Sequence, residues 1–424
     1  MDRYLRRVVD DELDEFLAGL PAVALEGAKA VGKTATAERR AATVYRLDEP
    51  QQRALVEAEP AQVARGDTPV LVDEWQRVPA TWDVVRRAVD TDPRPGRFLL
   101  TGSASPAVPP THSGAGRIVT LRMRPMTLVE RGGVAPSVSL QELLTGQRGR
   151  VSGRSSMGLE GYADAIVASG FPGLQLLSGR LLRTQLDGWP RRIVDSDLAE
   201  AGQRVRNPAA LRRWLTAYAA ATATTASYET IRDAATSGEA DKPARSTVTA
   251  YRDALDGLWV IDPLEAWLPV GSPLRRLIAS PKHHLADPAL AARLLGVGVA
   301  GLLEGSDVGP PVPRDGVLLG HLFESLVVLC VRVYAQAAEA TVRHMRTKSG
   351  VHEVDVIVQR DDHRVVAIEV KLGGTVDDND VRHLHWLARE IGNDLLDAIV
   401  VTTGRDAYRR PDGIAVIPAA LLGP

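Results

Sequence analysis

Apolar runs of strand length alternate with amphipathic stretches over the N-terminal part of the chain. Three of these runs are bounded by polar or turn-forming residues: 22–25, 70–73 and 97–103. Such runs are typical of strands that are buried on both faces of a parallel sheet. Residues 5–20 place apolar side chains at helical spacing, and residues 35–40 read as a second helix. The pattern predicts an α/β domain with a parallel sheet over residues 1–135.

Helical periodicity dominates the middle of the chain from Leu159 onward. Residues 136–206 are predicted to form a helical lid or linker, in which residues 146–158 are a polar loop. An amphipathic stretch over residues 181–198 is expected to be interrupted at Gly188 and Pro190.

Residues 207–275 are predicted to form a winged-helix-like domain. Its expected elements are helices at 211–220, at 228–235 and from Pro243, and a strand within 255–261. The third helix carries Arg245 and Arg252, which would face a DNA major groove in a helix-turn-helix. Because this basic cluster is small, a helical linker that packs internally is the favoured interpretation.

Strand patterns return near the C-terminus, where residues 276–424 are predicted to form a second α/β domain. Two apolar strands, at 352–358 and 365–371, are separated by a polar turn, and residues 320–327 read as a helix. On the second strand, Glu369 and Lys371 are two positions apart and therefore project from the same face.

The turn after the first predicted strand fits the phosphate-binding pattern G-x-x-x-x-G-K-[ST] at every fixed position. Its residues are Gly27, Ala28, Lys29, Ala30, Val31, Gly32, Lys33 and Thr34. Backbone N–H groups of such a turn form an anion site with the N-terminus of the following helix. In this pattern Lys33 bridges the β- and γ-phosphates of ATP, and the Thr34 hydroxyl ligates Mg²⁺. The flanking strand and helix disfavour the alternative of a glycine-containing turn with a chance Lys-Thr.

Acidic and hydroxyl side chains end the two other predicted strands. Asp73 and Glu74 close one apolar run, and Thr101 and Ser103 close the next. We expect Asp73 to hold Mg²⁺ and Glu74 to orient or deprotonate the attacking water. Thr101 or Ser103 would sense the γ-phosphate or position water, and an ordinary turn role explains these two residues equally well.

Together these residues resemble AAA-type ATPases of the archaeal-ATPase-like group, which carry a C-terminal domain of unknown function. The matching segments are the phosphate loop, Leu-Asp-Glu-Pro at 47–50, Leu-Val-Asp-Glu-Trp-Gln at 71–76, Leu-Leu-Thr-Gly-Ser at 99–103, Gly-Arg at 116–117 and a looser Pro-Met-Thr-Leu-Val-Glu at 125–130. The resemblance implies a P-loop ATPase fold over residues 1–135. It also makes Arg117 a candidate γ-phosphate contact, in its own subunit or in a neighbour, while an exposed arginine without this role is the alternative.

The C-terminal region resembles the core of the PD-(D/E)XK nuclease fold at Glu324, Asp355, Glu369 and Lys371. The resemblance implies that Asp355 and Glu369 bind one or two divalent metals, and that Glu324 completes the metal shell or orients water. It implies that Lys371 activates water and stabilises the developing charge. A salt bridge on an exposed strand face is the alternative explanation of Glu369 and Lys371, and the fold alone does not guarantee cleavage.

Composition narrows the functional classes. The chain has 424 residues, 45% of them hydrophobic, and a net charge of −2, so no global basic field favours nucleic acid. The single cysteine, Cys330, excludes an intramolecular disulfide framework and is expected in the core. We expect no membrane span and no signal peptide, and hence a cytoplasmic protein. The paired histidines His283 and His284 lack metal-ligand spacing and are expected at the surface.

Three hypotheses follow for function. The leading hypothesis is a Mg²⁺-dependent ATPase coupled to a nuclease-like, DNA-acting C-terminal domain. The second is a nucleotide-switched regulatory or interaction protein without nuclease activity. The third is a DNA-binding regulator that acts through residues 207–267. ATP is the expected ligand, and DNA, a second copy of the chain and a protein are the candidate partners.

Overall fold

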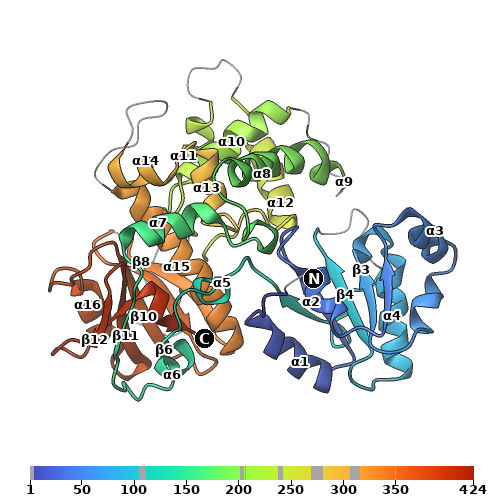
Figure 1. Ribbon diagram of the computed structural model, residues 1–424, viewed down its shortest axis with the longest axis horizontal. Helices are drawn as coiled ribbons and strands as arrows, with labels where there is room; N and C mark the ends of the chain where they lie inside the picture. Colours follow the sequence, from blue (N-terminus) through green and yellow to red (C-terminus); the bar gives the residue numbers. More distant parts are fainter. Residues whose placement is uncertain are drawn as a thin grey trace.

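The chain folds into three regions, and the C-terminal region also includes a short segment that follows the N-terminal sheet (Figure 1). A parallel sheet with helices lies at the N-terminal end, helices fill the middle, and a mixed sheet lies at the C-terminal end. The computed structural model describes residues 4–104, 111–200, 205, 207–236, 242–268, 280–305, 316–348 and 350–424. The expected boundaries at residues 206 and 275 lie outside the described residues. The predicted α/β class with a helical middle is confirmed at this level.

The N-terminal sheet has five strands, and all neighbouring strands are parallel. Their order is β2 (Thr43–Arg46), β3 (Val70–Asp73), β4 (Phe98–Gly102), β1 (Ala22–Glu26) and β5 (Val119–Arg122). The three central strands β1, β3 and β4 are mostly apolar and buried because both faces of the sheet are covered there, whereas the edge strands β2 and β5 are more polar and only partly buried. Since β4 lies between β1 and β3, its carboxyl end adjoins the carboxyl ends of both.

Helices cover both faces of this sheet (Figure 1). They are α1 (Val9–Gly19), α2 (Lys33–Glu38), α3 (Pro50–Ala58) and α4 (Ala80–Thr91). Ala22 and Ala24 share a buried cluster with Val85 of α4, whereas Val23 and Leu25 belong to the cluster on the opposite face. This alternation is what the two-residue period of a strand produces. The helix predicted from residue 5 begins only at Val9.

The segment after the N-terminal sheet joins the C-terminal domain before the chain enters the middle helices. Its elements are α5 (Leu128–Arg131), β6 (Val138–Ser139), α6 (Leu140–Leu144) and β7 (Gly153–Arg154). Strand β6 pairs with β14 (Leu422–Gly423), and β7 pairs with β12 (Asp406–Arg409). The polar loop expected at residues 146–158 therefore runs along the edge of the C-terminal sheet.

The middle region consists of helices packed on one another. They are α7 (Leu159–Ala168), α8 (Gly179–Arg192), α9 (Leu198–Glu200), α10 (Pro208–Ala220), α11 (Tyr228–Ala234), α12 (Arg245–Gly257), α13 (Pro288–Leu294) and α14 (Val299–Glu304). Short 3-10 turns occur here and elsewhere, at Pro60–Ala64, Trp75–Arg77, Pro172–Leu174, Gly392–Asp394 and Ala419–Leu421.

Two predictions for the middle region are wrong in detail. Gly188 and Pro190 do not interrupt α8, because the helix continues into a π-helical turn, Ile193–Asp197, that absorbs the irregularity. Residues 255–261 do not form a regular strand, since α12 runs to Gly257 and Ile261 makes only an isolated bridge to Leu285. The helices expected for a winged helix are present without a β-hairpin wing among the described residues.

The C-terminal sheet has seven strands in the order β7-β12-β13-β11-β10-β9-β8. The strands not yet given are β8 (Thr341–Arg346), β9 (Glu353–Gln359), β10 (Val365–Lys371), β11 (Leu395–Thr402) and β13 (Ala415–Pro418). Strands β10, β11 and β13 are mutually parallel, and the outer pairs are antiparallel. Helix α15 (Val317–Ala337) packs against one face of the sheet, and α16 (Arg382–Ile391) packs against the opposite face in a second buried cluster.

Helix α15 bears on the expectation that the protein has no membrane span, without deciding it. It is long and apolar enough by length and composition, with a mean hydropathy of 1.8 in its most apolar window. However, 72% of that window is buried inside the protein, which is the environment of a core helix. Cys330 lies on this helix and is buried, as predicted.

One aspartate joins all three regions. Asp262 of the middle region forms ion pairs with Arg122 (3.2 Å), Arg124 (3.0 Å) and Arg332 (2.6 Å). Arg122 ends β5 of the N-terminal sheet, and Arg332 lies on α15. Burial alone would raise the pKa of Asp262, but attraction to the three arginines outweighs it and holds the pKa well below its ordinary value.

We expect Asp262→Asn to lower the free energy of unfolding by about 3–5 kcal/mol, because it leaves buried arginines without a counter-charge. The contribution of Asp262 is present above an unfolded pKa of about 3.9 and is lost as the pH falls toward its lower folded pKa. Urea denaturation at pH 7 measures the effect, with Asp253→Asn as the control because that carboxylate forms an exposed pair. Equal stability of the two variants would contradict the structural role of Asp262.

Candidate functional site

The phosphate-loop sequence forms a compact turn between β1 and α2. Gly27 has φ of 153°, and a Cβ there would lie 2.1 Å from the carbonyl oxygen of Met123. Gly32 has φ of 102° and immediately precedes Lys33, the first residue of α2. Both positions therefore require glycine, and the turn leads its backbone into a helix N-terminus. This geometry is suited to binding an anion.

The Lys33 side chain is folded back onto the loop. Its Nζ donates to the carbonyl oxygens of Gly27 (2.8 Å) and Ala28 (2.9 Å). The residue is 4% exposed, and burial lowers the pKa of Lys33 to about 8. A buried ammonium held only by carbonyl groups would gain from a closer anion.

The start of helix α2 and the end of β4 both meet the end of β3 at Asp73. Its Oδ1 accepts hydrogen bonds from the Thr34 hydroxyl (2.8 Å) and from the Thr101 hydroxyl. Thr101 reaches this position because β4 lies between β1 and β3. Burial raises the pKa of Asp73, and the two hydroxyls partly offset the rise. The carboxylate and hydroxyl oxygens form the kind of ligand set that Mg²⁺ prefers, so the side chains fit this ion.

Glu74 adopts an unusual backbone conformation next to Asp73. Its φ of 56° is in the left-handed region, which a non-glycine residue rarely occupies and which costs on the order of 1–3 kcal/mol. Glu74 Oε2 accepts a hydrogen bond from the Ser103 hydroxyl at 2.8 Å and another from the side-chain amide of Gln76. The side chain is thereby fixed at the mouth of the cleft described next.

A cleft of about 320 Å³ opens in front of these residues. One wall belongs to the N-terminal domain: Lys29, Thr34, Asp48, Asp73, Glu74, Gln76, Arg77, Ser103 and Ala104. The other belongs to the middle region: Trp189, Ile193, Asp197, Leu258 and Val260. Lys29 bridges the two walls through an ion pair of 2.8 Å with Asp197, on the π-helical turn after α8. Such π turns are frequent at functional sites.

Residues 20–131 match the model of the AAA domain family. This segment is therefore an AAA domain, as the resemblance implied. The roles of single residues in the AAA domain are proposals that the match does not test.

The remaining matches are to domains of unknown function. Residues 159–300 match the family DUF8612, and residues 319–422 match the family DUF4143. The expected C-terminal domain of unknown function is thus present. Neither description mentions a nuclease or DNA binding, so the PD-(D/E)XK assignment stays a prediction.

Curated relatives and a solved structure show distant similarity. The uncharacterized proteins Mb2031c of Mycobacterium bovis and Rv2008c of Mycobacterium tuberculosis are each 27% identical over 233 residues, which is 54% of this chain. The match spans only 44% of the length of those relatives. The Walker-type ATPase PABY2304 of Pyrococcus abyssi aligns over 69% of this chain and 96% of its own, with 17% identity and a TM-score of 0.41.

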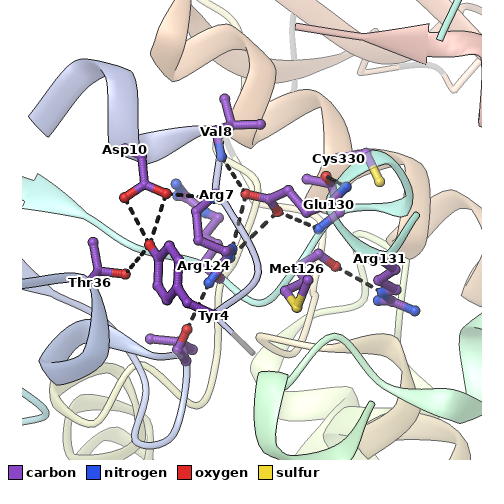
Figure 2. A network of polar contacts seen from close by, with 12 residues as sticks. Tyr4, Arg7, Val8, Asp10, Thr36, Arg124, Met126, Glu130, Arg131 and Cys330 are labelled. Atoms are coloured by element: carbon purple, nitrogen blue, oxygen red, sulfur yellow. Dashed lines mark hydrogen bonds and ion pairs between the residues drawn. The ribbon is translucent and has the colours of Figure 1, made fainter. Parts of the chain in front are cut away.

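An N-terminal strap, residues 4–8, holds the phosphate loop of the AAA domain (Figure 2). Arg7 donates to the carbonyl oxygens of Val31 (2.8 Å) and Arg124 (2.7 Å), and it pairs with Glu130 at 3.1 Å. Both charged side chains are only 3% exposed. Glu130 also caps α5, which contacts Cys330 of α15 through the Leu128 N–H. Sequence reasoning missed this link, since no motif marks Arg7.

Arg117 does not join the other predicted residues. It pairs with Asp90 at 2.8 Å and is not among the described residues that line the cleft. A γ-phosphate contact within the same subunit is therefore not supported by its position. A contact to a neighbouring subunit stays a prediction.

The basic residues predicted on the third middle helix are largely neutralised by acids. Arg245 pairs with Glu229 of α11 at 2.8 Å, and Arg252 pairs with Asp253 at 3.0 Å. This arrangement favours internal packing, as the sequence interpretation did, over a surface free to contact phosphates.

The structure brings the four predicted C-terminal residues to one region. Lys371 pairs with Glu369 at 3.0 Å, while Val366 and Ile368 of the same strand belong to the core beneath α15. Glu324 and Asp355 are joined by a residue that sequence reasoning missed, Lys282, whose Nζ is 2.9 Å from each carboxylate. No signal in the sequence marked this lysine.

The neighbours of Lys282 correct a second expectation. His283 and His284 are 1% and 2% exposed, so they are buried and not at the surface. Their segment is held by bridges to the middle region, which fix Lys282 within the core. The described residues contain no group of three or more His, Cys, Asp or Glu side chains arranged to hold a metal ion.

Proposed function

We propose that the protein hydrolyses ATP at the cleft between the AAA domain and the middle helices. The observation that supports this most directly is the convergence of the Thr34 and Thr101 hydroxyls on Asp73, beside the phosphate loop. Phosphate binding, metal binding and γ-phosphate sensing need groups at this one edge of the sheet. Strands β3 and β4 supply Asp73 and Thr101, and the loop and helix α2 that follow β1 supply the phosphate-binding backbone and Thr34.

The phosphate loop would hold the triphosphate by its backbone. We propose that the N–H groups of residues 28–34 surround the β-phosphate and that Lys33 exchanges its bonds to Gly27 and Ala28 for phosphate oxygens. The exchange is favourable because an ammonium–phosphate hydrogen bond is stronger than an ammonium–carbonyl bond in a buried site. It also keeps Lys33 charged despite its burial.

Hydrolysis requires a positioned water molecule and a stabilised leaving group. We propose that Glu74 accepts a proton from the attacking water, with Ser103 holding its Oε2 in place. Thr101 would orient the γ-phosphate for in-line attack. Bound Mg²⁺, held by Thr34 and Asp73, would neutralise charge on the β- and γ-phosphates.

The second wall of the cleft offers apolar surface for the nucleoside. Trp189, Ile193 and Leu258 line it, and an aromatic ring and aliphatic side chains suit an adenine base. Because this wall belongs to the middle region, nucleotide binding would alter the Lys29–Asp197 pair. The middle region would thereby respond to the nucleotide state.

Metal dependence tests the proposal. We expect chelation by EDTA to abolish hydrolysis. We expect Asp73→Asn to raise the Mg²⁺ concentration that gives the half-maximal rate by at least about tenfold, which corresponds to a loss of about 1.4 kcal/mol in the free energy of Mg²⁺ binding. Phosphate release measured against Mg²⁺ concentration gives both values. Asp406→Asn is the control, because that carboxylate is 65% exposed and lies on β12. Hydrolysis that persists in EDTA would refute the proposed reaction.

A second candidate is the nucleotide-switched regulatory protein without nuclease activity. It is favoured by the shared cleft, in which the same residues that would bind ATP contact the middle region. DNA, a second copy of the chain or another protein would then be the partner, and cleavage would have no role. Binding of ATP without turnover would support this candidate over the first.

A further inference from the structure

The C-terminal acidic cluster contains a lysine at its centre. Lys282 Nζ lies 2.9 Å from Glu324, 2.9 Å from Glu353 and 2.9 Å from Asp355. The ammonium donates hydrogen bonds to Glu324 and Asp355, and it forms an ion pair with Glu353. The lysine side chain is 1% exposed, and Glu324 and Asp355 are 11% and 14% exposed, so these two contacts are largely shielded from water.

The segment that carries Lys282 is fixed and does not reach in from solvent. The Lys282 N–H donates to Leu264 O at 2.9 Å, and Leu264 N–H donates back to Lys282 O at 2.8 Å. The next residue, His283, donates to Thr224 O at 3.0 Å and accepts the Ala223 N–H at 2.8 Å. Backbone bonds on both sides therefore hold the side chain in the cluster.

The carboxylates that a metal would need are already engaged. Asp355 uses Oδ1 for Lys282 and Oδ2 for the Val370 N–H at 3.0 Å. Glu369 gives its Oε2 to Lys371 at 3.0 Å, and only its buried Oε1 lacks a partner. An ammonium 2.9 Å from both Glu324 and Asp355 occupies the place where a divalent ion would share these two carboxylates, and its charge would repel that ion. The residues present do not fit the divalent ion that the nuclease resemblance implies.

We propose that Lys282 is the resident cation of this site and that it takes the position of a divalent metal between Glu324 and Asp355. The C-terminal domain then functions without a metal and does not cleave DNA by the two-carboxylate mechanism. The ammonium keeps the three acids together and ties the middle region to the C-terminal sheet. This inference concerns a site separate from the ATP cleft, and it holds whether or not the protein hydrolyses ATP.

Manganese binding to the full chain tests the proposal. All variants carry Thr34→Ala and Asp73→Asn, so that metal at the ATP cleft does not contribute, and nucleotide is omitted. Electron paramagnetic resonance of free Mn²⁺ counts the bound ions. We expect no Asp355-dependent Mn²⁺ site in this background and one site after Lys282→Ala. Addition of Asp355→Asn should remove the new site, and Lys348→Ala, at an exposed lysine, should create none.

Two outcomes would overturn the proposal. One is a Mn²⁺ site in the Lys282-containing background that disappears with Asp355→Asn, because the lysine would then yield its position to a metal. The other is a folded Lys282→Ala variant that gains no site. If Lys282→Ala fails to fold, the proposal is still tested by comparing Mn²⁺ binding of the background protein with and without Asp355→Asn. Cleavage of supercoiled plasmid with Mg²⁺ or Mn²⁺ is expected to be absent in the wild type, and Asp355-dependent cleavage would refute the inference.

Discussion

The Lys33→Ala variant should bind ATP about 100-fold more weakly than the wild type, a loss of about 2.7 kcal/mol. Hydrogen bonds to charged groups contribute about 1.5–3 kcal/mol, and Lys33 Nζ is buried within the phosphate loop. Isothermal titration calorimetry with ATP measures the affinity. Lys348→Ala is the matched control, since it removes an exposed lysine in the turn between β8 and β9.

The pH dependence of the same affinity provides a second test. Burial lowers the pKa of free Lys33 to about 8, and bound phosphate favours its charged form. Wild-type affinity should therefore fall as the pH rises above 8. The Lys33→Ala variant should lack this fall. Unchanged ATP affinity in Lys33→Ala would remove the phosphate loop from the proposed function.

The Glu74→Gln variant should bind ATP with near wild-type affinity and hydrolyse it about 10²–10⁴-fold more slowly, the range expected for loss of a general base. The amide keeps the shape of the side chain and an acceptor for Ser103, but it cannot take a proton from water. Single-turnover hydrolysis with excess protein separates this chemical step from product release.

An exposed glutamate supplies the control for this variant. Glu57 lies on α3 and its side chain is 55% exposed, so the Glu57→Gln variant should hydrolyse ATP at the wild-type rate. Equal single-turnover rates for Glu74→Gln and the wild type would exclude Glu74 as the base. A loss of affinity as large as the loss of turnover would instead assign Glu74 to binding.

The AAA domain was predictable because its signals are local. The two glycines of the phosphate loop, Gly27 and Gly32, are needed because the backbone has positive φ at both positions. The strands of a sheet covered on both faces are recognisable in the sequence as short apolar runs. Asp73 and Thr101 could be placed together because carboxyl ends of parallel strands share an edge. Their common hydrogen bond depends only on β4 lying between β1 and β3.

The contacts that the sequence did not reveal all join distant segments. Arg7 reaches Glu130, and Lys282 reaches Asp355, across pairs of elements that no spacing rule connects. Asp262, which forms ion pairs with three arginines, likewise has no motif around it in the sequence. A short hydrogen-bonded strand such as β7, with two residues, carries too little pattern to be recognised. Tertiary packing decides these positions, and local propensity does not.

The pairing of β6 with β14 and of β7 with β12 makes the C-terminal domain discontinuous in the sequence. During synthesis, residues 138–154 leave the ribosome long before their partners exist. At about 5–20 residues per second, the wait is on the order of tens of seconds. The AAA domain can fold in that interval, but the C-terminal domain is completed only when β14 emerges. A fragment that starts at residue 319, where the DUF4143 match begins, would lack two of its strands and expose unpaired sheet edges.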